Sequence, residues 1–152
     1  MPGILRPPFI ARRAQRSLAA NLKTYIVEDS PVILKNLVVA LEELAPVQVV
    51  GTAADEASAL AWLSDPGHSA DLVIIDIFLK SGSGLGVLRE MQAAGHRSKR
   101  VVLTNYATTN MREACLKLGA DRVFDKSGEV EELLAYCARI DGGAATGPGE
   151  LS

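Results

Sequence analysis

The chain has 152 residues, of which 48% are hydrophobic and 22% charged, and its formal net charge at neutral pH is −2. This length and composition predict one globular domain with its own hydrophobic core. No apolar run is long enough to span a membrane, so a membrane-spanning protein is excluded. Neither positive nor negative residues form a long block, so nucleic-acid binding is not indicated.

Residues 1–21 form a basic N-terminal extension that contains four arginines and no acidic residue. The arginines are not followed by an apolar core, so the segment is not a secretory signal and a cytoplasmic protein is expected. We expect this extension to be flexible. The alternative is a basic arm that binds an acidic partner.

The first strand and helix of the folded part follow directly. Residues 24–27 form the expected strand, which ends in Glu28 and Asp29. Ser30 is a suitable N-cap and Pro31 a suitable first helical residue. The apolar stripe of this helix is Leu34, Leu37, Val38, Leu41 and Leu44, and Pro46 stops the helix.

A strand at 47–53 and a helix at 55–63 lead to the central strand at 72–75. This apolar run is too short for a helix and rich in β-branched residues, as expected for a strand buried on both faces. Asp76 then stands at the carboxyl end of a central strand, where open α/β sheets place their ligands. Alternatively, Asp76 only begins a turn before the third helix at 84–94.

The remaining elements repeat the alternation. A strand at 100–104 ends in Thr104, and a helix with the stripe Met111, Ala114, Cys115 and Leu118 is closed by Gly119. A strand at 122–126 ends in Lys126, and Ser127 is expected to cap a last helix. Its stripe is Val130, Leu133, Leu134, Cys137 and Ile140. Residues 141–152 are expected to be a flexible tail.

Cys115 and Cys137 therefore fall on the apolar stripes of two helices. This placement favours buried thiols in a reducing cytoplasm over a disulfide or a metal site. His68 and His96, the only histidines, each lie beside a glycine in a loop. A histidine-rich metal site or a Ser-His-Asp triad is not indicated.

Five alternations of strand and helix predict an α/β fold for residues 22–140, with a doubly wound, five-stranded parallel sheet between two helical layers. In such a sheet all carboxyl ends lie along one edge. The polar residues that end four of the strands can therefore converge on one crevice: Glu28, Asp29, Asp76, Thr104 and Lys126.

Three carboxylates in one pocket repel each other, by about 4 kcal/mol per pair at about 4 Å and an effective dielectric constant near 20. One lysine cannot offset this repulsion, so a divalent cation is expected, and all-oxygen ligation suits Mg²⁺ or Mn²⁺. With the metal bound, one carboxylate can attack a phosphoryl group whose oxygens are held by the metal, an ammonium and a hydroxyl.

At these residues the sequence resembles the receiver domain of bacterial two-component response regulators, over about residues 22–140. The resemblance rests on five motifs in order: Val27-Glu28-Asp29-Ser30, Ile75-Asp76 with Gly84 eight residues on, Leu103-Thr104, Gly119-Ala120-Asp121, and Lys126. It implies a flavodoxin-like fold. It also implies a phosphorylation-dependent switch, which is not an enzyme acting on other substrates. Because little of the sequence follows residue 140, we expect the stand-alone type of receiver.

The resemblance also implies roles for individual residues. Asp76 would accept the phosphoryl group and Asp29 would bind Mg²⁺ directly, with Glu28 as a ligand through water. The carbonyl of Phe78 would be a further metal ligand, Thr104 the switch hydroxyl and Lys126 the phosphate-binding cation. The implied partners are a sensor histidine kinase or phosphotransfer protein upstream and an unknown protein downstream. The few residues after residue 140 lead us to expect no DNA-binding domain.

Four positions depart from the family pattern. Val123 replaces a usual aromatic residue, Ser127 and Lys80 stand where proline is common, and Asn105 stands where a small residue is usual. These departures leave the phosphorylation chemistry intact. They put the usual readout by an aromatic side chain in question.

The sequence supports three other functions less well. A metal-dependent phosphohydrolase with an Asp nucleophile would need a second Asp two residues after Asp76, where the sequence has Phe78. A phosphorylation-independent scaffold would need a missing acceptor, metal ligand or lysine, and all are present. Dinucleotide binding through residues 82–86 is excluded because the third glycine comes one residue early and the motif follows the third strand.

Overall fold

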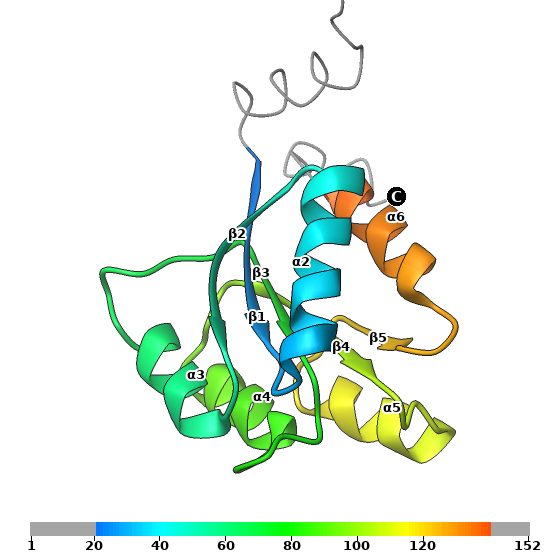
Figure 1. Ribbon diagram of the computed structural model, residues 1–152. Coiled ribbons are helices and arrows are strands. Elements are labelled where there is room, and N and C mark those ends of the chain that lie inside the picture. The colour runs from blue at the N-terminus through cyan, green and yellow to red at the C-terminus, as the bar shows by residue number, and fades with distance from the viewer. Residues whose placement is uncertain (1–20, 141–152) are drawn as a thin grey trace, which may run out of the picture.

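The computed structural model describes residues 21–140, which form a parallel sheet between two layers of helices (Figure 1). The strands are β1 Leu22–Val27, β2 Val47–Ala53, β3 Leu72–Ile75, β4 Lys99–Thr104 and β5 Arg122–Asp125. The helices are α2 Pro31–Leu44, α3 Glu56–Leu63, α4 Gly84–Ala93, α5 Thr109–Lys117 and α6 Val130–Ile140. The sheet order is β2-β1-β3-β4-β5, with every pair parallel, which confirms the predicted flavodoxin-like fold.

The core consists of two clusters, one on each face of the sheet. Successive strand residues point to opposite faces, so Val73 packs with α3, α4 and α5, while Ile74 packs with α2 and α6. Both faces of β3 are buried, as the continuous apolar run predicts. Cys115 and Cys137 are buried free thiols, one in each cluster.

Local capping signals explain where several helices begin and end. The hydroxyl of Ser30 accepts the Ile33 N–H, and the Asp55 carboxylate accepts the Ser58 N–H. α2 ends one residue before Ala45, its C-cap, which is followed by Pro46. Gly119 has φ +101°, so it is the glycine that the end of α5 requires.

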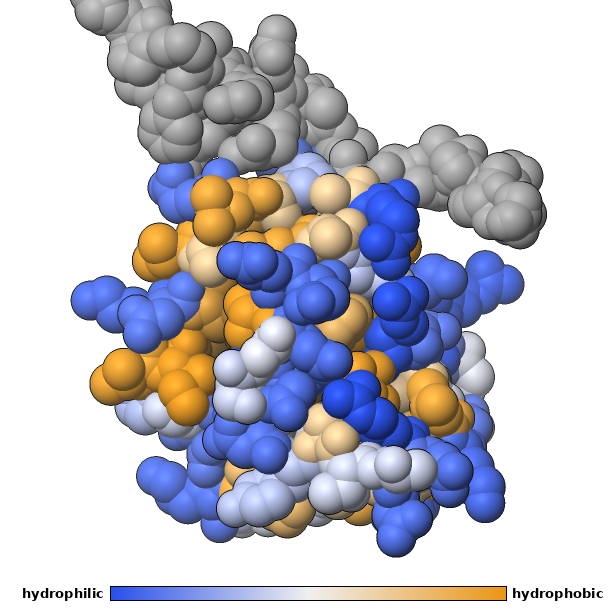
Figure 2. All heavy atoms as spheres, turned by 90° about the vertical axis from the view of Figure 1, so that its right-hand side faces the viewer, coloured by the Kyte–Doolittle hydropathy of each residue, from blue (hydrophilic) through white to orange (hydrophobic). Residues whose placement is uncertain are grey.

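Three details of the prediction are wrong. Leu44 does not join the apolar stripe of α2: it is 68% exposed because it lies at the end of the helix, past the last residue that faces the sheet. With Val32 and Val39 it contributes exposed apolar atoms on α2, and Figure 2 shows apolar side chains among polar ones on this side of the molecule.

Ser127 does not cap the last helix. Its N–H and its hydroxyl both donate to Asp125 Oδ1, at 2.8 and 2.7 Å, and this Asx-type turn replaces the cap. β5 ends at Asp125, so Lys126 lies in the turn, and α6 begins only at Val130.

The predictions for the N-terminal extension and the C-terminal tail lie outside the described residues. Within residues 21–140, every helix is too short or too polar to cross a lipid bilayer.

Candidate functional site

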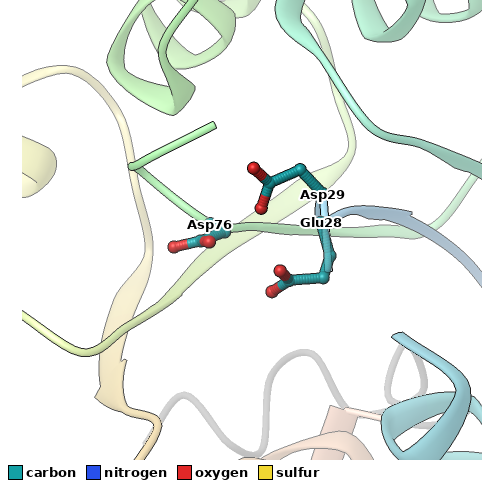
Figure 3. Close-up of side chains that lie close together, drawn as sticks. All are labelled: Glu28, Asp29 and Asp76. Carbon is teal, nitrogen blue, oxygen red and sulfur yellow. The ribbon is translucent and has the colours of Figure 1, made fainter. Parts of the chain in front are cut away.

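Three carboxylates meet beyond the carboxyl ends of β1 and β3. Glu28 and Asp29 follow β1, Asp76 follows β3, and their side chains occupy one space (Figure 3). One carboxylate oxygen from each residue lies within 4.8 Å of the others. Glu28 and Asp76 are almost fully buried, at 3% and 5% exposure, while Asp29 is half-buried. The predicted acidic cluster is confirmed.

The main chain places these residues side by side. Val27 and Ile75 are partners in the parallel β1–β3 ladder. The β1–β3 pairing continues past the strand ends, because the Asp76 N–H donates to the Val27 carbonyl at 2.9 Å. On the other side of β1, the Glu28 N–H donates to the Ala53 carbonyl of β2, also at 2.9 Å. Backbone hydrogen bonds of the sheet thus hold two carboxylates together despite their repulsion.

Lys126 enters the same pocket from the turn after β5. Its Nζ lies 2.8 Å from Glu28 Oε1 and 3.1 Å from Asp76 Oδ2. Its own N–H donates to the Thr104 carbonyl at 2.9 Å, which holds the turn against the end of β4. The lysine side chain is 10% exposed, so these are largely buried ion pairs.

The charges in the pocket shift each other's protonation. Burial raises the pKa of Asp76 above its ordinary value, although hydrogen bonding and charge attraction from Lys126 oppose the shift; Glu28 adds to it. Burial alone would lower the pKa of Lys126, but its contacts with Glu28 and Asp76 raise the pKa overall. The lysine is therefore charged, and the pocket holds more negative charge than one ammonium offsets.

Thr104 is fully buried at the end of β4, and its hydroxyl oxygen accepts the Tyr106 N–H at 3.2 Å. Tyr106 is 58% exposed and Phe78 is 51% exposed. Their rings touch edge to face, with centroids 4.7 Å apart. Residues two positions after Thr104 and Asp76 therefore form an aromatic pair at this edge of the sheet.

The loop between β3 and α4 is held from α3 by Glu56, a residue that sequence reasoning missed. Glu56 Oε1 accepts the Ser83 N–H at 2.9 Å, and the Glu56 N–H donates to the Ser81 carbonyl at 3.2 Å. Ser83 in turn pairs with Phe78 in an antiparallel bridge. Only the crossing of α3 and the loop brings these residues together, so no local signal indicates the contact.

The glycines of this loop have structural roles. Gly82 has φ +80°, a backbone conformation that favours glycine. A Cβ on Gly84 would lie 2.2 Å from the Asp76 carbonyl oxygen, and one on Gly86 would lie 2.3 Å from Glu56 Oε2. These contacts account for the glycine-rich sequence that superficially resembles a dinucleotide-binding motif.

The donor set fits a hard divalent cation. Three carboxylates from two adjacent strand ends supply oxygen ligands, and Asp29 leaves the site open to solvent on one side. Oxygen-rich, partly open sites of this kind suit Mg²⁺, which keeps several waters when bound.

The family follows from comparison with known proteins. A family model described as "Response regulator receiver domain" matches residues 24–138. The chain therefore belongs to the receiver domain family of response regulators, the proteins of two-component signalling. Its acidic cluster is typical of the Mg²⁺ site in this family, and the family implies a histidine kinase partner.

Individual relatives cover the same region. A probable transcriptional regulatory protein of Picosynechococcus sp. is 32% identical over 128 residues, which are 81% of this chain and 50% of that protein. The two-component response regulator PhoP of Pseudomonas aeruginosa is 32% identical over 114 residues, 75% of this chain and 49% of that protein. The chain thus spans about half the length of the curated relatives it matches.

Solved structures share the fold. The receiver domain of the Francisella response regulator 1452 has a TM-score of 0.70 at 20% identity, over 77% of this chain and 93% of that one. The phosphorylated cyanobacterial phytochrome response regulator RcpA has a TM-score of 0.67 at 24% identity, over 82% of this chain and 94% of that one.

Proposed function

We propose that this protein is a phosphorylation-dependent switch that accepts a phosphoryl group on Asp76 from a histidine kinase or a histidine phosphotransfer protein. The observation that carries the proposal is the buried Asp76 carboxylate, which lies beside two further carboxylates and 3.1 Å from the Lys126 ammonium. A nucleophile, a cation for phosphoryl oxygens and a place for a metal meet at one point.

The transfer is a single displacement. An Asp76 oxygen attacks the phosphorus of the donor's phosphoimidazole; the P–O bond forms as the P–N bond breaks, and the electron pair of that bond stays on the imidazole nitrogen. Lys126 then holds one phosphoryl oxygen, and the Thr104 hydroxyl donates to another. Such transfers need positioning and charge more than covalent assistance.

Glu28, Asp29, Asp76 and the Phe78 carbonyl are the proposed metal ligands, with Glu28 acting through water. When bound there, Mg²⁺, or Mn²⁺ in its place, would neutralise charge on the phosphoryl oxygens. The half-buried position of Asp29 supports its role as the ligand that the cation meets first.

The output is proposed to be contact with a downstream protein. Phosphorylation adds negative charge to a pocket in which Lys126 holds contacts that a phosphoryl group would compete for. The Thr104 hydroxyl, which accepts the Tyr106 N–H, can donate its own proton to the new group. The segments that bear these residues can then shift and change the surface that a partner meets.

The test is phosphorylation by acetyl phosphate with Mg²⁺. We expect one phosphoryl group per chain, labile to base as an acyl phosphate is, and complete loss of labelling in Asp76→Asn. Asp29→Asn should weaken Mg²⁺ binding, measured by calorimetry, and slow phosphorylation as well. Asp65→Asn, which alters an exposed carboxylate in the α3–β3 loop, is the matched control and should behave as the parent.

Labelling that survives in Asp76→Asn would contradict the acceptor assignment. Repeated turnover of a phosphate ester by the parent would instead favour a phosphohydrolase.

A further inference from the structure

The side chain of Arg112 contacts three segments: the β4–α5 loop, strand β5 and the β5–α6 turn. Arg112, on α5, donates from Nε to the Ala107 carbonyl at 3.0 Å, in the β4–α5 loop. Its Nη1 donates to the Val123 carbonyl of β5 at 2.9 Å, and its Nη2 lies 3.1 Å from Glu129 Oε1 in the β5–α6 turn. A rigid guanidinium fork is suited to such simultaneous contacts.

Glu129 passes this contact on to the turn that carries Lys126. The same Oε1 atom accepts the Asp125 N–H at 2.7 Å, a short charge-assisted hydrogen bond next to Lys126 in the chain. The Asp125 N–H, and after it Arg112, holds the pKa of Glu129 below its ordinary value, so the carboxylate is charged. Arg112 and Glu129 therefore hold the turn from outside while Asp76 and Glu28 hold Lys126 from inside.

The other arm of Arg112 reaches the segment that carries Thr104. The Thr104 hydroxyl accepts the Tyr106 N–H, and the Arg112 Nε bond falls on Ala107, the next residue. The Lys126 N–H also donates to the Thr104 carbonyl. Arg112 thus contacts two segments near the pocket, the one after β4, which follows Thr104, and the one after β5, which carries Lys126.

Val123 contributes only its main chain to this arrangement. Its side chain is aliphatic, 9% exposed and packed in the core cluster that includes Cys115. The Val123 side chain has no polar atom, so it cannot form or break a hydrogen bond when the pocket changes. On this side of the pocket, Arg112 provides a polar connection to the outer surface.

We propose that Arg112 is a positioning residue that transmits occupancy of the acidic pocket to the outer face formed by α5, β5 and α6. The inference rests on the proposed function, because the signal is a phosphoryl group on Asp76. That group draws Lys126 away from its present contacts and offers a new acceptor to Thr104. The segment after β4 and the segment after β5 then both move toward Asp76. The single planar guanidinium group of Arg112 cannot keep its hydrogen bonds to both segments, so it releases the Ala107 carbonyl and keeps its contact with Glu129.

The outer face formed by α5, β5 and α6 is turned toward the viewer in Figure 2, where its surface is mostly hydrophilic. It carries Arg122 and Arg139, whose guanidinium groups lie 5.1 and 5.7 Å from the Tyr136 ring centroid. A movement of α5 or of the β5–α6 turn would alter the neighbourhood of these groups. A partner protein could therefore read the state of the pocket here without touching it.

Amide hydrogen exchange with Mg²⁺ alone and with Mg²⁺ plus beryllofluoride, a phosphoryl mimic, tests the inference. In the parent we expect beryllofluoride to change exchange at residues 76–78 and 104–107 and also at Asp125 and in α5. In Arg112→Lys the response near Asp76 should persist, with beryllofluoride affinity within about threefold of the parent. The response at Asp125 and in α5 should fall by at least about twofold.

Glu129→Gln is the second variant. It keeps an acceptor for the Asp125 N–H but removes the charge that Arg112 contacts, so it should reduce the remote response as well. Arg122→Lys, an arginine on β5 that contacts aromatic rings instead of the pocket segments, is the matched control and should respond as the parent.

A purely structural role of Arg112 would lower stability equally in both states and leave the remote response intact. A full remote response in Arg112→Lys, or none in a parent that binds beryllofluoride, would overturn the inference alone. Failure of the parent to bind beryllofluoride with Mg²⁺ would overturn the proposed function, and this inference with it.

Discussion

The ammonium of Lys126 lies between two buried carboxylates, 2.8 Å from Glu28 Oε1 and 3.1 Å from Asp76 Oδ2. The remaining negative charge gives the pocket its affinity for a cation. A phosphoryl group would then find one ammonium already inside the pocket, and it would compete with the carboxylates for that ammonium.

Phe78 is expected to set how long a phosphoryl group persists on Asp76. Its exposed ring packs against Tyr106, and a hydrocarbon surface there excludes the water that must attack the phosphorus in line. Phe78→Asn should therefore speed dephosphorylation, by about tenfold for each 1.4 kcal/mol by which the barrier falls. The decay of labelled protein in saturating Mg²⁺ measures the rate.

Val39→Asn, which replaces an exposed apolar residue on α2, is the control and should leave the lifetime unchanged. A lifetime in Phe78→Asn equal to or longer than that of the parent would show that the aromatic pair does not shield the group. The substitution leaves the main-chain carbonyl, the proposed metal ligand, in the chain.

At the scale of elements, two glycines in the first turn of α4 differ in how easily the neighbouring atoms could make room for a Cβ atom. A Cβ on Gly84 would meet the Asp76 carbonyl oxygen at 2.2 Å, and this backbone atom cannot move without displacing the pocket. A Cβ on Gly86 would meet the carboxylate of Glu56, the end of a flexible side chain.

Gly84→Ala should therefore lower the free energy of unfolding by about 2 kcal/mol or more, as expected for overpacking against a rigid neighbour. Gly86→Ala should stay within about 1 kcal/mol of the parent, because alanine's higher helix propensity offsets the displacement of Glu56. Urea denaturation of both variants measures the difference. Equal losses in the two variants would mean that the β3–α4 loop yields as easily as a side chain.

For the whole molecule, the acidic pocket is a source of instability that the rest of the fold compensates. The sheet, its two core clusters and the backbone bonds beyond β1 and β3 hold three carboxylates together. Burial raises the pKa of Asp76, so the folded protein holds that proton more tightly than the unfolded chain does. As pH rises from the ordinary value of 3.8 through the raised value, the folded state loses stability.

Asp76→Asn should consequently be more stable than the parent at pH 7 without Mg²⁺, on the order of 1 kcal/mol or about 3 °C in Tm. The advantage should shrink as the pH is lowered and disappear below the ordinary carboxyl pKa, where both proteins are neutral at this position. Thermal unfolding followed by circular dichroism across this pH range measures it. Mg²⁺ should stabilise the parent more than the variant; a variant less stable than the parent at pH 7 would contradict the electrostatic account.

The sequence by itself determined the fold and the members of the acidic pocket. Ser30, Asp55 and Gly119 are local signals whose meaning does not depend on distant residues. The alternation of apolar strands and amphipathic helices requires a parallel sheet, and a parallel sheet brings the carboxyl ends of its strands to one edge. Glu28, Asp29, Asp76 and Lys126 can therefore be grouped from the sequence alone.

Only the tertiary structure decided what surrounds that pocket. Glu56 contacts Ser83 across 27 positions in the chain, and Arg112 contacts Glu129 across 17. The edge contact of Phe78 with Tyr106 and the turn that Asp125 forms with Ser127 also depend on side-chain directions. Periodicity and capping encode the position of an element along the chain, whereas these contacts depend on how far elements slide and rotate against each other when the core packs.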